Sequence, residues 1–456
     1  MKFVVEACAA DVRRGSVQTL VKNVCTDSRQ AKEGDLFFAI NGERFNGHDF
    51  LNEVAAKDVA AVVVEKKKIP ARLPKCEVLV VEDTRVALGK LATAYRKDFT
   101  LPFVAVGGSN GKTTTKELLA SALSQKLATV WSEASFNNDI GVPLTLLRVE
   151  ESHQAAVLEV GANHPGELAP LVKMIQPKFG VITNIGREHL EFFGDVTGVA
   201  QEEGWLAELL PADGKLFING DDEWTERIAK RTCAKIVRVG LDGKNDWRAR
   251  AIRLDKNGVT FCMDAPKAEF SSEYRVNLLG RHQVMNALFA VAVSEELGLS
   301  RPEIQRGVAE CKPPKMRLQF WEANGVRVLD DAYNANADST IAALETLCDL
   351  PLQGRRVAVL GDMEELGAHS ESAHAEIGRR AAELGIGQLF TVGKMAAVTA
   401  KAARAGGLNR VIEFTDVEAA VKVVKNFLKT GDVVLLKASR AARLERIAET
   451  LKSEKS

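Results

Sequence analysis

A glycine-rich turn between an apolar run and a helical pattern limits the possible folds of this chain more than any other feature. It lies in the segment "FVAVGGSNGKTTTKELL", residues 103–119, and we expect the helix to begin near Lys112. Glycines allow positive φ and close approach of the backbone, so successive N–H groups can surround an anion beside the helix N-terminus. The turn consists of Gly107, Gly108, Ser109, Asn110 and Gly111. It predicts a strand–loop–helix unit that binds a nucleotide, with Lys112 bridging the outer phosphates.

The spacing of this turn departs from the usual phosphate-loop pattern G-x-x-x-x-G-K-[ST], whose first glycine would fall on Val106. The alternative interpretation is a tight strand-to-helix turn with an incidental lysine. The glycines stand at a strand-to-helix junction and three threonines follow them, which favours nucleotide binding. The hydroxyl of Thr113 or Thr114 could then ligate magnesium.

The composition describes an ordinary globular protein. Its 456 residues are too many for one hydrophobic core, and 61 basic residues balance 61 acidic ones. We therefore expect several domains and no nucleic-acid or membrane-surface partner. No signal-peptide pattern and no run of about 18 apolar residues occurs, so we expect no membrane insertion. Seven scattered cysteines without a C-x-x-C pair are typical of reduced thiols in a cytoplasmic protein.

Changes of pattern divide the chain into three α/β domains. Short apolar runs alternate with helical patterns over residues 1–98, which end before Pro102. Continuous apolar strands alternate with amphipathic helices over residues 99–312, which is typical of a parallel sheet covered on both faces. Residues 246–277 are expected to form an antiparallel insertion there. The alternation begins again after "KPPK" and predicts a Rossmann-like domain over residues 313–456.

Two polar residues follow strands of the predicted central sheet. Glu159 ends the strand in "AAVLEVG", and His189 comes just past "FGVITNIG". Because the carboxyl ends of parallel strands share one edge of a sheet, we expect both side chains near the phosphates, where they could bind magnesium together with a threonine hydroxyl. Imidazole is an unusual magnesium ligand, so a capping or packing role for His189 is the alternative.

Several long motifs carry a resemblance to a known family. Besides "GGSNGKTTTKE" they are "TDSRQAKEGDLFFAINGERFNGHDF", "FNNDIGVPLTLL", "LEVGANHPGEL", "NIGREHLEFFG", "GRHQVMNALFA", "DDAYNANADS", "GDMEELG" and "KASRAARLE". They extend along almost the whole chain, which resembles the Mur ligase family. The resemblance implies a small N-terminal UDP-binding domain, a central ATPase-like domain and a C-terminal Rossmann-like domain.

The resemblance also implies an activity, namely ATP-dependent amide formation in peptidoglycan precursor synthesis. The motifs point to the reaction that joins D-alanyl-D-alanine to UDP-N-acetylmuramoyl-tripeptide. The tripeptide carboxylate would attack the γ-phosphate of ATP, and the dipeptide amine would then displace phosphate from the acyl phosphate. ATP and magnesium (Mg2+) are the implied cofactors, and we expect a monomer whose C-terminal domain closes over the nucleotide.

Site residues follow from the resemblance, position by position. The metal ligands would be Thr113, Glu159 and His189. The resemblance places Asn286 at the adenine. Independently of it, the guanidinium of Arg317, just after "KPPK", suits the outer phosphate, and Asp331 could bind the ribose hydroxyls. The UDP-sugar would be bound by Ser28, Arg29, Asn46, Gly47 and His48. Further substrate contacts would come from Asn137, Asn138, Asn334, Asn336, Lys437 and Ser439. Asp338 or Ser339 is expected to cap the helix that follows Asn336.

Position 203 departs from the family pattern. Most Mur ligases have a carbamylated lysine at this distance from the histidine, and here the residue is Glu203. We hypothesise that the Glu203 carboxylate replaces the carbamate at the metal, directly or through a water. Glu202 would require a register shift of one residue. The alternative is that both glutamates are solvated positions on an ordinary helix.

Three other functions stay open at this point. The diaminopimelate-adding ligases share the domain plan but carry "DNPR", whereas this chain has "DDAYNAN" in the comparable region. Folylpolyglutamate synthetase shares the ATP chemistry but lacks a similar N-terminal domain. A non-catalytic nucleotide-binding protein is disfavoured by the presence of Lys112, Glu159 and His189. The sequence does not distinguish diaminopimelate from lysine in the acceptor peptide, and it identifies no general base.

Overall fold

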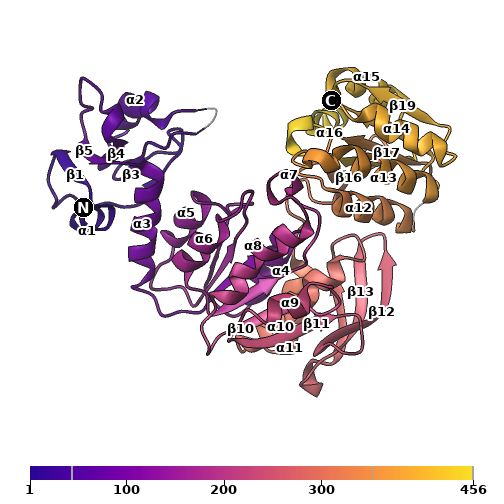
Figure 1. Ribbon diagram of the computed structural model, residues 1–456, viewed down its shortest axis with the longest axis horizontal. Helices are drawn as coiled ribbons and strands as arrows, with labels where there is room; N and C mark the ends of the chain where they lie inside the picture. Colours follow the sequence, from indigo (N-terminus) through magenta and orange to yellow (C-terminus); the bar gives the residue numbers. More distant parts are fainter. Residues whose placement is uncertain (43–44, 352, 454–456) are drawn as a thin grey trace.

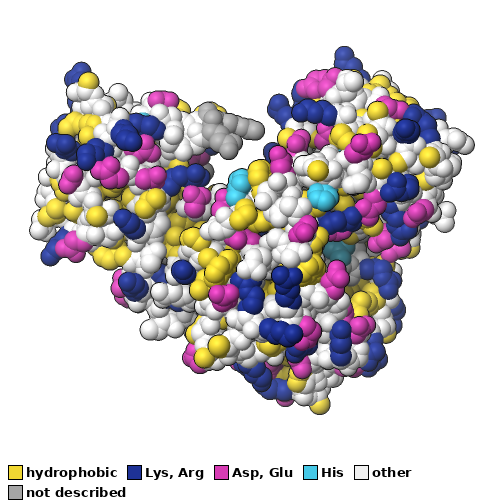
Figure 2. Space-filling model, viewed as in Figure 1, with side chains coloured by type: hydrophobic (Ala, Val, Ile, Leu, Met, Phe, Trp, Pro, Cys, Tyr) yellow, Lys and Arg dark blue, Asp and Glu magenta, His cyan; other side chains and the backbone are white. Residues whose placement is uncertain are grey.

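The computed structural model describes residues 1–42, 45–351 and 353–453 and contains three α/β domains, each built around its own sheet (Figure 1). The N-terminal and C-terminal domains lie at opposite ends of the central domain. Basic and acidic side chains are interspersed over the face shown in Figure 2, in keeping with the balanced charge of the chain. The expected three-domain α/β fold is confirmed.

The N-terminal domain has a five-stranded sheet in the order β1-β5-β4-β3-β2, parallel except for β1. Its strands are β1 (Asp11–Arg14), β2 (Val24–Cys25), β3 (Leu36–Phe38), β4 (Ala61–Glu65) and β5 (Glu77–Val81). Its helices are α1 (Lys2–Cys8), α2 (Leu51–Ala55) and α3 (Thr84–Arg96). Asp83 caps α3 by accepting from the N–H groups of Arg85 and Val86, and α3 leads into the central domain.

The central domain has a nine-stranded sheet in the order β14-β13-β12-β11-β10-β9-β6-β8-β7. Its strands are β6 (Phe103–Gly107), β7 (Thr129–Trp131), β8 (Ala155–Glu159), β9 (Phe179–Ile182), β10 (Lys215–Asn219), β11 (Lys235–Gly240), β12 (Trp247–Asp255), β13 (Gly258–Asp264) and β14 (Ser272–Val276). Strands β6 to β12 pair in parallel, whereas β13 is antiparallel to both β12 and β14. The antiparallel insertion expected near residues 246–277 is therefore confirmed.

Helices cover both faces of the central sheet. They are α4 (Lys112–Leu123), α5 (Gly141–Leu146), α6 (Leu168–Ile175), α7 (Leu190–Phe193), α8 (Val196–Glu208), α9 (Thr225–Ala229), α10 (Gln283–Glu296) and α11 (Arg301–Glu310). One apolar cluster packs the sheet against α4, α10 and α11, and a second packs it against α6 and α8. Because both faces are buried, the inner strands read as continuous apolar runs.

The C-terminal domain has a six-stranded sheet in the order β15-β16-β20-β17-β18-β19. Its strands are β15 (Gln319–Ala323), β16 (Val326–Asp331), β17 (Arg356–Gly361), β18 (Gln388–Val392), β19 (Val411–Phe414) and β20 (Val433–Lys437). Its helices are α12 (Ala337–Asp349), α13 (Ser370–Glu383), α14 (Ala396–Ala405), α15 (Val417–Phe427) and α16 (Glu445–Lys452). The expected Rossmann-like alternation is present, and β16 to β20 pair in parallel. Strand β15 was not predicted, because this half-buried edge strand, antiparallel to β16, lacks a continuous apolar run.

Within the described part of the chain, no helix has both the length and the apolar character that crossing a membrane requires. All seven cysteines carry free thiols, as their scattered spacing predicts.

Candidate functional site

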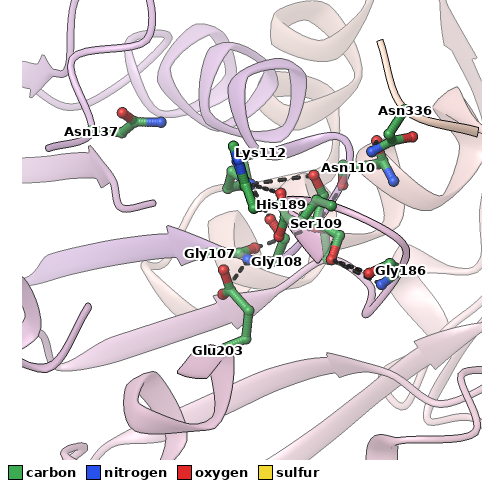
Figure 3. Close-up of polar contacts among 12 residues, drawn as sticks. Gly107, Gly108, Ser109, Asn110, Lys112, Asn137, Gly186, His189, Glu203 and Asn336 are labelled. Atoms are coloured by element: carbon green, nitrogen blue, oxygen red, sulfur yellow. Dashed lines mark hydrogen bonds and ion pairs between the residues drawn. The ribbon is translucent and has the colours of Figure 1, made fainter. Parts of the chain in front are cut away.

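The phosphate loop, residues 107–111, connects β6 to α4 and has the backbone geometry that its glycines allow. Gly108 has φ 108° and Gly111 has φ 84°, both in the left-handed region. A Cβ atom on Gly108 would lie 2.4 Å from Thr183 Oγ1, so a larger residue would have no room there. The predicted strand–loop–helix unit is confirmed, and Figure 3 shows the loop with its contacts.

Lys112 lies at the start of α4 with its side chain turned toward the loop. Its Nζ donates to the carbonyls of Gly108 and Ser109 (Figure 3). It also lies 3.1 Å from Glu188 Oε2. Burial by itself lowers the pKa of Lys112, but Glu188 and two further carboxylates outweigh this effect and raise that pKa above its usual value. The lysine is therefore held as a cation at the loop. Glu188 was not predicted, although it directly precedes His189.

A cavity opens beside Lys112 between the central and C-terminal domains. The central domain contributes Ser109, Asn110, Gly111, Lys112, Thr113, Ser135, Asn137, Glu159, Asn163, Glu188 and His189 to its lining. The C-terminal domain contributes Arg317, Tyr333, Asn334, Ala335, Asn336, Ser339, Glu364, Glu365, Leu366 and Lys437. Residues that are far apart in the sequence thus meet at one edge of the central sheet, where α/β folds bind their ligands.

Glu159 ends β8 at this cavity and is 1% exposed. Its Oε1 accepts a hydrogen bond from Asn137 Nδ2 at 3.0 Å. Among the described residues its Oε2 finds no hydrogen-bond partner, which is costly for a buried carboxylate oxygen. Such an oxygen, in a cavity that Thr113 also lines, suits a hard cation such as magnesium.

Protein side chains alone do not form a closed metal cage here. In the ranges that the structure describes, no three His, Cys, Asp or Glu residues gather as a metal-binding group. Magnesium commonly uses one or two protein oxygens together with substrate phosphates and water, so the donor set fits that ion. His189 Nδ1 forms an ion pair with Glu365, and this contact lowers the pKa of that carboxyl. A metal contact of His189 stays a prediction.

Glu203 lies on α8 directly under the phosphate loop. Its Oε2 accepts a hydrogen bond from Gly108 N at 2.6 Å, and burial raises its pKa to about 7 (Figure 3). Glu202 is also buried and accepts from Gly166 N and Leu168 N. The alternative of two solvated glutamates is therefore wrong. A metal contact of Glu203 stays a prediction, since the structure places its carboxylate against the loop backbone.

Ser135 and Lys116 are two further residues that the sequence analysis missed. Ser135 Oγ lies 3.3 Å from Thr113 Oγ1 and accepts from Arg317 Nη2 at 3.3 Å. The fully buried Lys116 donates to the carbonyls of Ser132 and Ala134 at 2.7 Å each, which holds this segment beside α4. No local pattern marks either residue, because each acts through a loop distant in sequence.

Arg317 reaches the cavity from the link between the central and C-terminal domains. Its guanidinium lies 4.4 Å from the centre of the Tyr333 ring, a distance typical of a cation–π contact. Asp331, at the end of β16, accepts from Leu318 N at 3.1 Å and pairs with Lys437 at 2.6 Å. Lys437 is buried, and this burial lowers its pKa. Asp331 therefore fixes the segment that carries Arg317, and its contact with ribose stays a prediction.

Three other predicted residues of this domain have structural contacts. Asn334 offers its carbonyl to Lys437 Nζ at 2.8 Å. Ser439 Oγ accepts from Glu364 N and donates to Ala335 O, which joins two loops of the sheet edge. The cap of α12 was predicted wrongly. It is Asn336, which accepts from Ser339 N at 2.8 Å and forms a capping box with that residue.

The predicted adenine residue Asn286 lies in a second hollow next to Gly111. Asn286 Oδ1 accepts from Thr115, and its Nδ2 donates to Gln283, whose own amide contacts His282 Nε2 at 3.0 Å. Burial lowers the pKa of His282 to about 4, so this ring is neutral. Asn286 and Asp331 both line this hollow, and their contacts with adenine and ribose stay predictions.

The other predicted substrate residues differ in their surroundings. Asn137 lines the main cavity, whereas Asn138 accepts from Ile140 N and Gly141 N and so holds the turn that leads into α5. In the N-terminal domain, Arg29 pairs with Asp27, and buried Ser28 offers its carbonyl to Lys57.

The second N-terminal loop is held by its own contacts. The side-chain oxygen of Asn46 accepts a hydrogen bond from His48 N. Nε2 of the His48 ring accepts one from Glu65 N at 3.0 Å. A Cβ on Gly47 would lie 2.8 Å from Ile40 N, so glycine is needed for this close approach. The neighbouring residues 43–44 lie outside the described residues. Binding of UDP by both loops stays a prediction.

Comparison with known proteins finds similarity over nearly the whole chain. The models described as "Mur ligase family, catalytic domain", "Mur ligase middle domain" and "Mur ligase, glutamate ligase domain" match residues 20–96, 106–294 and 316–440. The UDP-N-acetylmuramoyl-tripeptide–D-alanyl-D-alanine ligase of Escherichia coli K12 is 36% identical over 97% of this chain and 96% of its own.

Solved structures show the same relationship. A crystal structure of MurF from Acinetobacter baumannii is 32% identical, with a TM-score of 0.88 over 99% of this chain and 98% of that one. MurF ligase from Thermotoga maritima, solved in complex with ADP, is 28% identical, with a TM-score of 0.80 over 96% and 99% of the two chains. Matching domain models and a relative of this identity over nearly full length place the chain in the Mur ligase family.

Proposed function

We propose that this protein is an ATP-dependent, ADP-forming ligase that adds D-alanyl-D-alanine to UDP-N-acetylmuramoyl-tripeptide. The observation that carries the proposal is the cavity in which the phosphate-loop lysine, Lys112, meets Arg317 and Lys437 of the C-terminal domain. Three cations around one cavity suit the phosphates of ATP. Curated relatives that bear the name of this reaction match over nearly their whole length.

The phosphate loop and its lysine would act on the outer phosphates. The loop places backbone groups and the α4 N-terminus around the phosphates, and Lys112 is kept protonated by Glu188. As the tripeptide carboxylate attacks the γ-phosphorus, negative charge shifts onto ADP, and a fixed cation at this point stabilises that charge. The dipeptide amine then attacks the acyl carbon and phosphate leaves. The reaction needs no nucleophile from the protein.

Magnesium is part of this proposal. Thr113 and Glu159 would hold it, because both line the cavity and Glu159 Oε2 is buried without a hydrogen-bond partner in the described chain. When bound, the ion supplies neutralisation of the phosphate charge. Metal contacts of His189 and Glu203 belong to the same proposal, and each needs a movement away from the contact that the structure records. Free thiols and the use of ATP fit action in the reducing cytoplasm.

Phosphate release tests the function directly. The purified protein receives Mg·ATP and UDP-N-acetylmuramoyl-tripeptide, in both the diaminopimelate and the lysine form, with D-alanyl-D-alanine, single amino acids or glutamate as the second substrate. We expect release, together with a product whose mass equals the pentapeptide precursor, with the dipeptide alone. Release with a single amino acid and not with the dipeptide would overturn the assigned substrate. The better of the two tripeptides identifies the third residue.

A further inference from the structure

Arg187 lies in the loop after β9, one residue before Glu188, and points away from the cavity into the C-terminal domain. Its guanidinium donates to two carboxylates there. Nε and Nη2 donate to Asp338 Oδ1 at 2.9 and 2.6 Å, and Nη1 and Nη2 donate to Glu376 at 2.6 and 3.1 Å. The backbone N–H of Arg187 also donates to Asp338 Oδ2 at 2.9 Å. One residue of the central domain thus makes five hydrogen bonds across the domain boundary.

The two carboxylates belong to different helices of the C-terminal domain. Asp338 is in the first turn of α12, where the helix dipole stabilises a negative charge, and Glu376 lies in α13. The planar guanidinium can donate hydrogen bonds to both carboxylates at once, which a lysine ammonium cannot do with the same geometry. The side chains of Arg187, Asp338 and Glu376 are 32%, 36% and 37% exposed, so salt will weaken this contact.

The loop that carries Arg187 is also hydrogen-bonded to the phosphate loop. Gly186 N donates to Ser109 Oγ at 2.8 Å, and Ser109 lies within the loop (Figure 3). A Cβ on Gly186 would lie 2.8 Å from Asp338 Oδ2, so the two domains meet closely here. Next to this contact, Asn336 Nδ2 donates to Asn110 Oδ1 at 3.0 Å. The start of α12 is therefore attached both to the phosphate loop and to the residue that follows Gly186.

We propose that Arg187 is a positioning residue that holds the C-terminal domain closed over the loaded phosphate loop. Its two carboxylate partners lie outside the lining of the main cavity, although Asp338 lines the second hollow beside Asn286. Arg187 acts by fixing α12 and α13. The closed arrangement brings Arg317 and Lys437 to the cavity. The inference rests on the proposed ATP-dependent function, and its test separates the two by measuring nucleotide binding and domain closure as well as ligation.

The test compares Arg187→Gln and Arg187→Lys with wild-type protein that has first been shown to ligate. Arg380→Gln is the matched control, because Arg380 also pairs with two carboxylates, Glu345 and Glu383, but entirely within the C-terminal domain. We measure kcat and both KM values, the dissociation constant of a non-hydrolysable ATP analogue, and the radius of gyration by small-angle X-ray scattering with that analogue. Thermal unfolding checks that each variant is folded.

We expect Arg187→Gln to raise the KM for ATP and the analogue dissociation constant about tenfold, in the range of ordinary coupling between sites. The KM for UDP-N-acetylmuramoyl-tripeptide should stay within about twofold, and the analogue should no longer reduce the radius of gyration. The KM for ATP and the analogue dissociation constant of Arg187→Lys should lie between those of Arg187→Gln and wild type. Both values of Arg380→Gln should match wild type. The difference in analogue dissociation constant between Arg187→Gln and wild type should become smaller at high salt, because salt screens the ion pairs of Arg187.

Other results would overturn the proposal. An unchanged KM for ATP with a lowered kcat alone would mean that the variant merely contains less folded protein. Normal closure in the scattering experiment would mean that other contacts hold the domain. If Arg187→Gln does not fold, Glu376→Gln removes one of the two carboxylate partners. That variant must then show the same effects on ATP and closure to a smaller degree, or the proposal fails.

Discussion

Two loops meet at the cavity where buried parallel strands end, residues 107–111 at the end of β6 and residues 331–336 at the end of β16. The first loop is shaped by its backbone, since Gly108 and Gly111 have positive φ and no side chain to interfere. The second is shaped by side chains. Asp331 fixes the backbone at Leu318 and pairs with Lys437, and Asn336 caps α12.

The difference separates two tasks that a similar strand–loop–helix unit can perform. A glycine loop presents its backbone to a ligand, and its lysine acts on that ligand directly. A loop whose polar side chains bond to protein groups holds one part of the protein against another. Changes in the first loop should therefore affect chemistry most, and changes in the second should affect the position of the C-terminal domain.

The strongest test of this comparison is Lys112→Ala. Because Lys112 is the cation at the loop, we expect ligation to fall by about a thousandfold, in line with the loss of a charge that stabilises the transition state. The free energy of unfolding should change far less. Steady-state phosphate release and thermal unfolding measure the two effects. Lys126→Ala is the control, since Lys126 lies just after the end of the same helix and donates to Gly298 O. Ligation within about tenfold of wild type would contradict the role of the loop.

The next effect is expected for Asp331→Asn. The change leaves the buried Lys437 without its anionic partner and weakens the support of the Arg317 segment, so ligation should fall about a hundredfold. The neighbouring Asp330→Asn is the control. Burial already raises the pKa of Asp330, which makes its neutral form less costly. Equal losses in both variants, measured as kcat/KM for ATP, would show that the effect is unspecific.

A pH-dependent effect is expected at His282, which lines the second hollow together with Gly111 and Asp331. Burial lowers the pKa of His282 to about 4, whereas the same ring in the unfolded chain keeps its ordinary pKa near 6.5. Below pH 6.5 the unfolded chain therefore takes up a proton that the folded protein does not, and the free energy of unfolding decreases as the pH falls toward 4. Between pH 7 and pH 5 the loss is about 2 kcal/mol. Urea unfolding of wild type and His282→Gln at both pH values checks this. A difference between the two proteins that does not shrink at pH 5 would contradict it.

The smallest effect is expected for Asn336→Ala. Loss of the α12 cap should lower the free energy of unfolding by about 1 kcal/mol. Loss of the contact with Asn110 should in addition raise the KM for ATP a few-fold. Asp416→Ala removes the cap of α15, which is remote from the cavity, and should show the first effect without the second. If both variants leave the KM unchanged, the second loop does not support the nucleotide site.

Much of the fold followed from local patterns. The alternation of continuous apolar runs and amphipathic helices predicted the two parallel sheets, because a strand buried on both faces must be apolar at every position. Strand β15 was not predicted, because an edge strand needs no continuous apolar run. The helix cap was assigned to Asp338 or Ser339 instead of Asn336, since several polar residues in a row can each serve as a cap and the backbone selects one.

Site residues could be predicted where one segment of the sequence contains the motif. They could not be predicted where their role depends on a contact with a residue distant in the sequence. Lys112 and Glu159 were expected from their motifs and Arg317 from the chemistry of a guanidinium beside phosphate, and all three line the cavity. Glu188 and Ser135 were missed, because only their contacts with Lys112 and Arg317 reveal them. Position 203 shows both cases, since the change from lysine could be seen in the sequence but the contact with Gly108 N could not.

The order of residues along the chain was sufficient to specify the phosphate loop and the three α/β domains. Glycine φ preferences and the periodicity of apolar residues act over a few neighbouring positions, so they can be read directly. Tertiary structure alone decided that Glu188 would face Lys112, 76 residues away, and that Arg187 would bind Asp338, 151 residues away. Such contacts depend on strand order and on how the domains pack, which no local pattern contains.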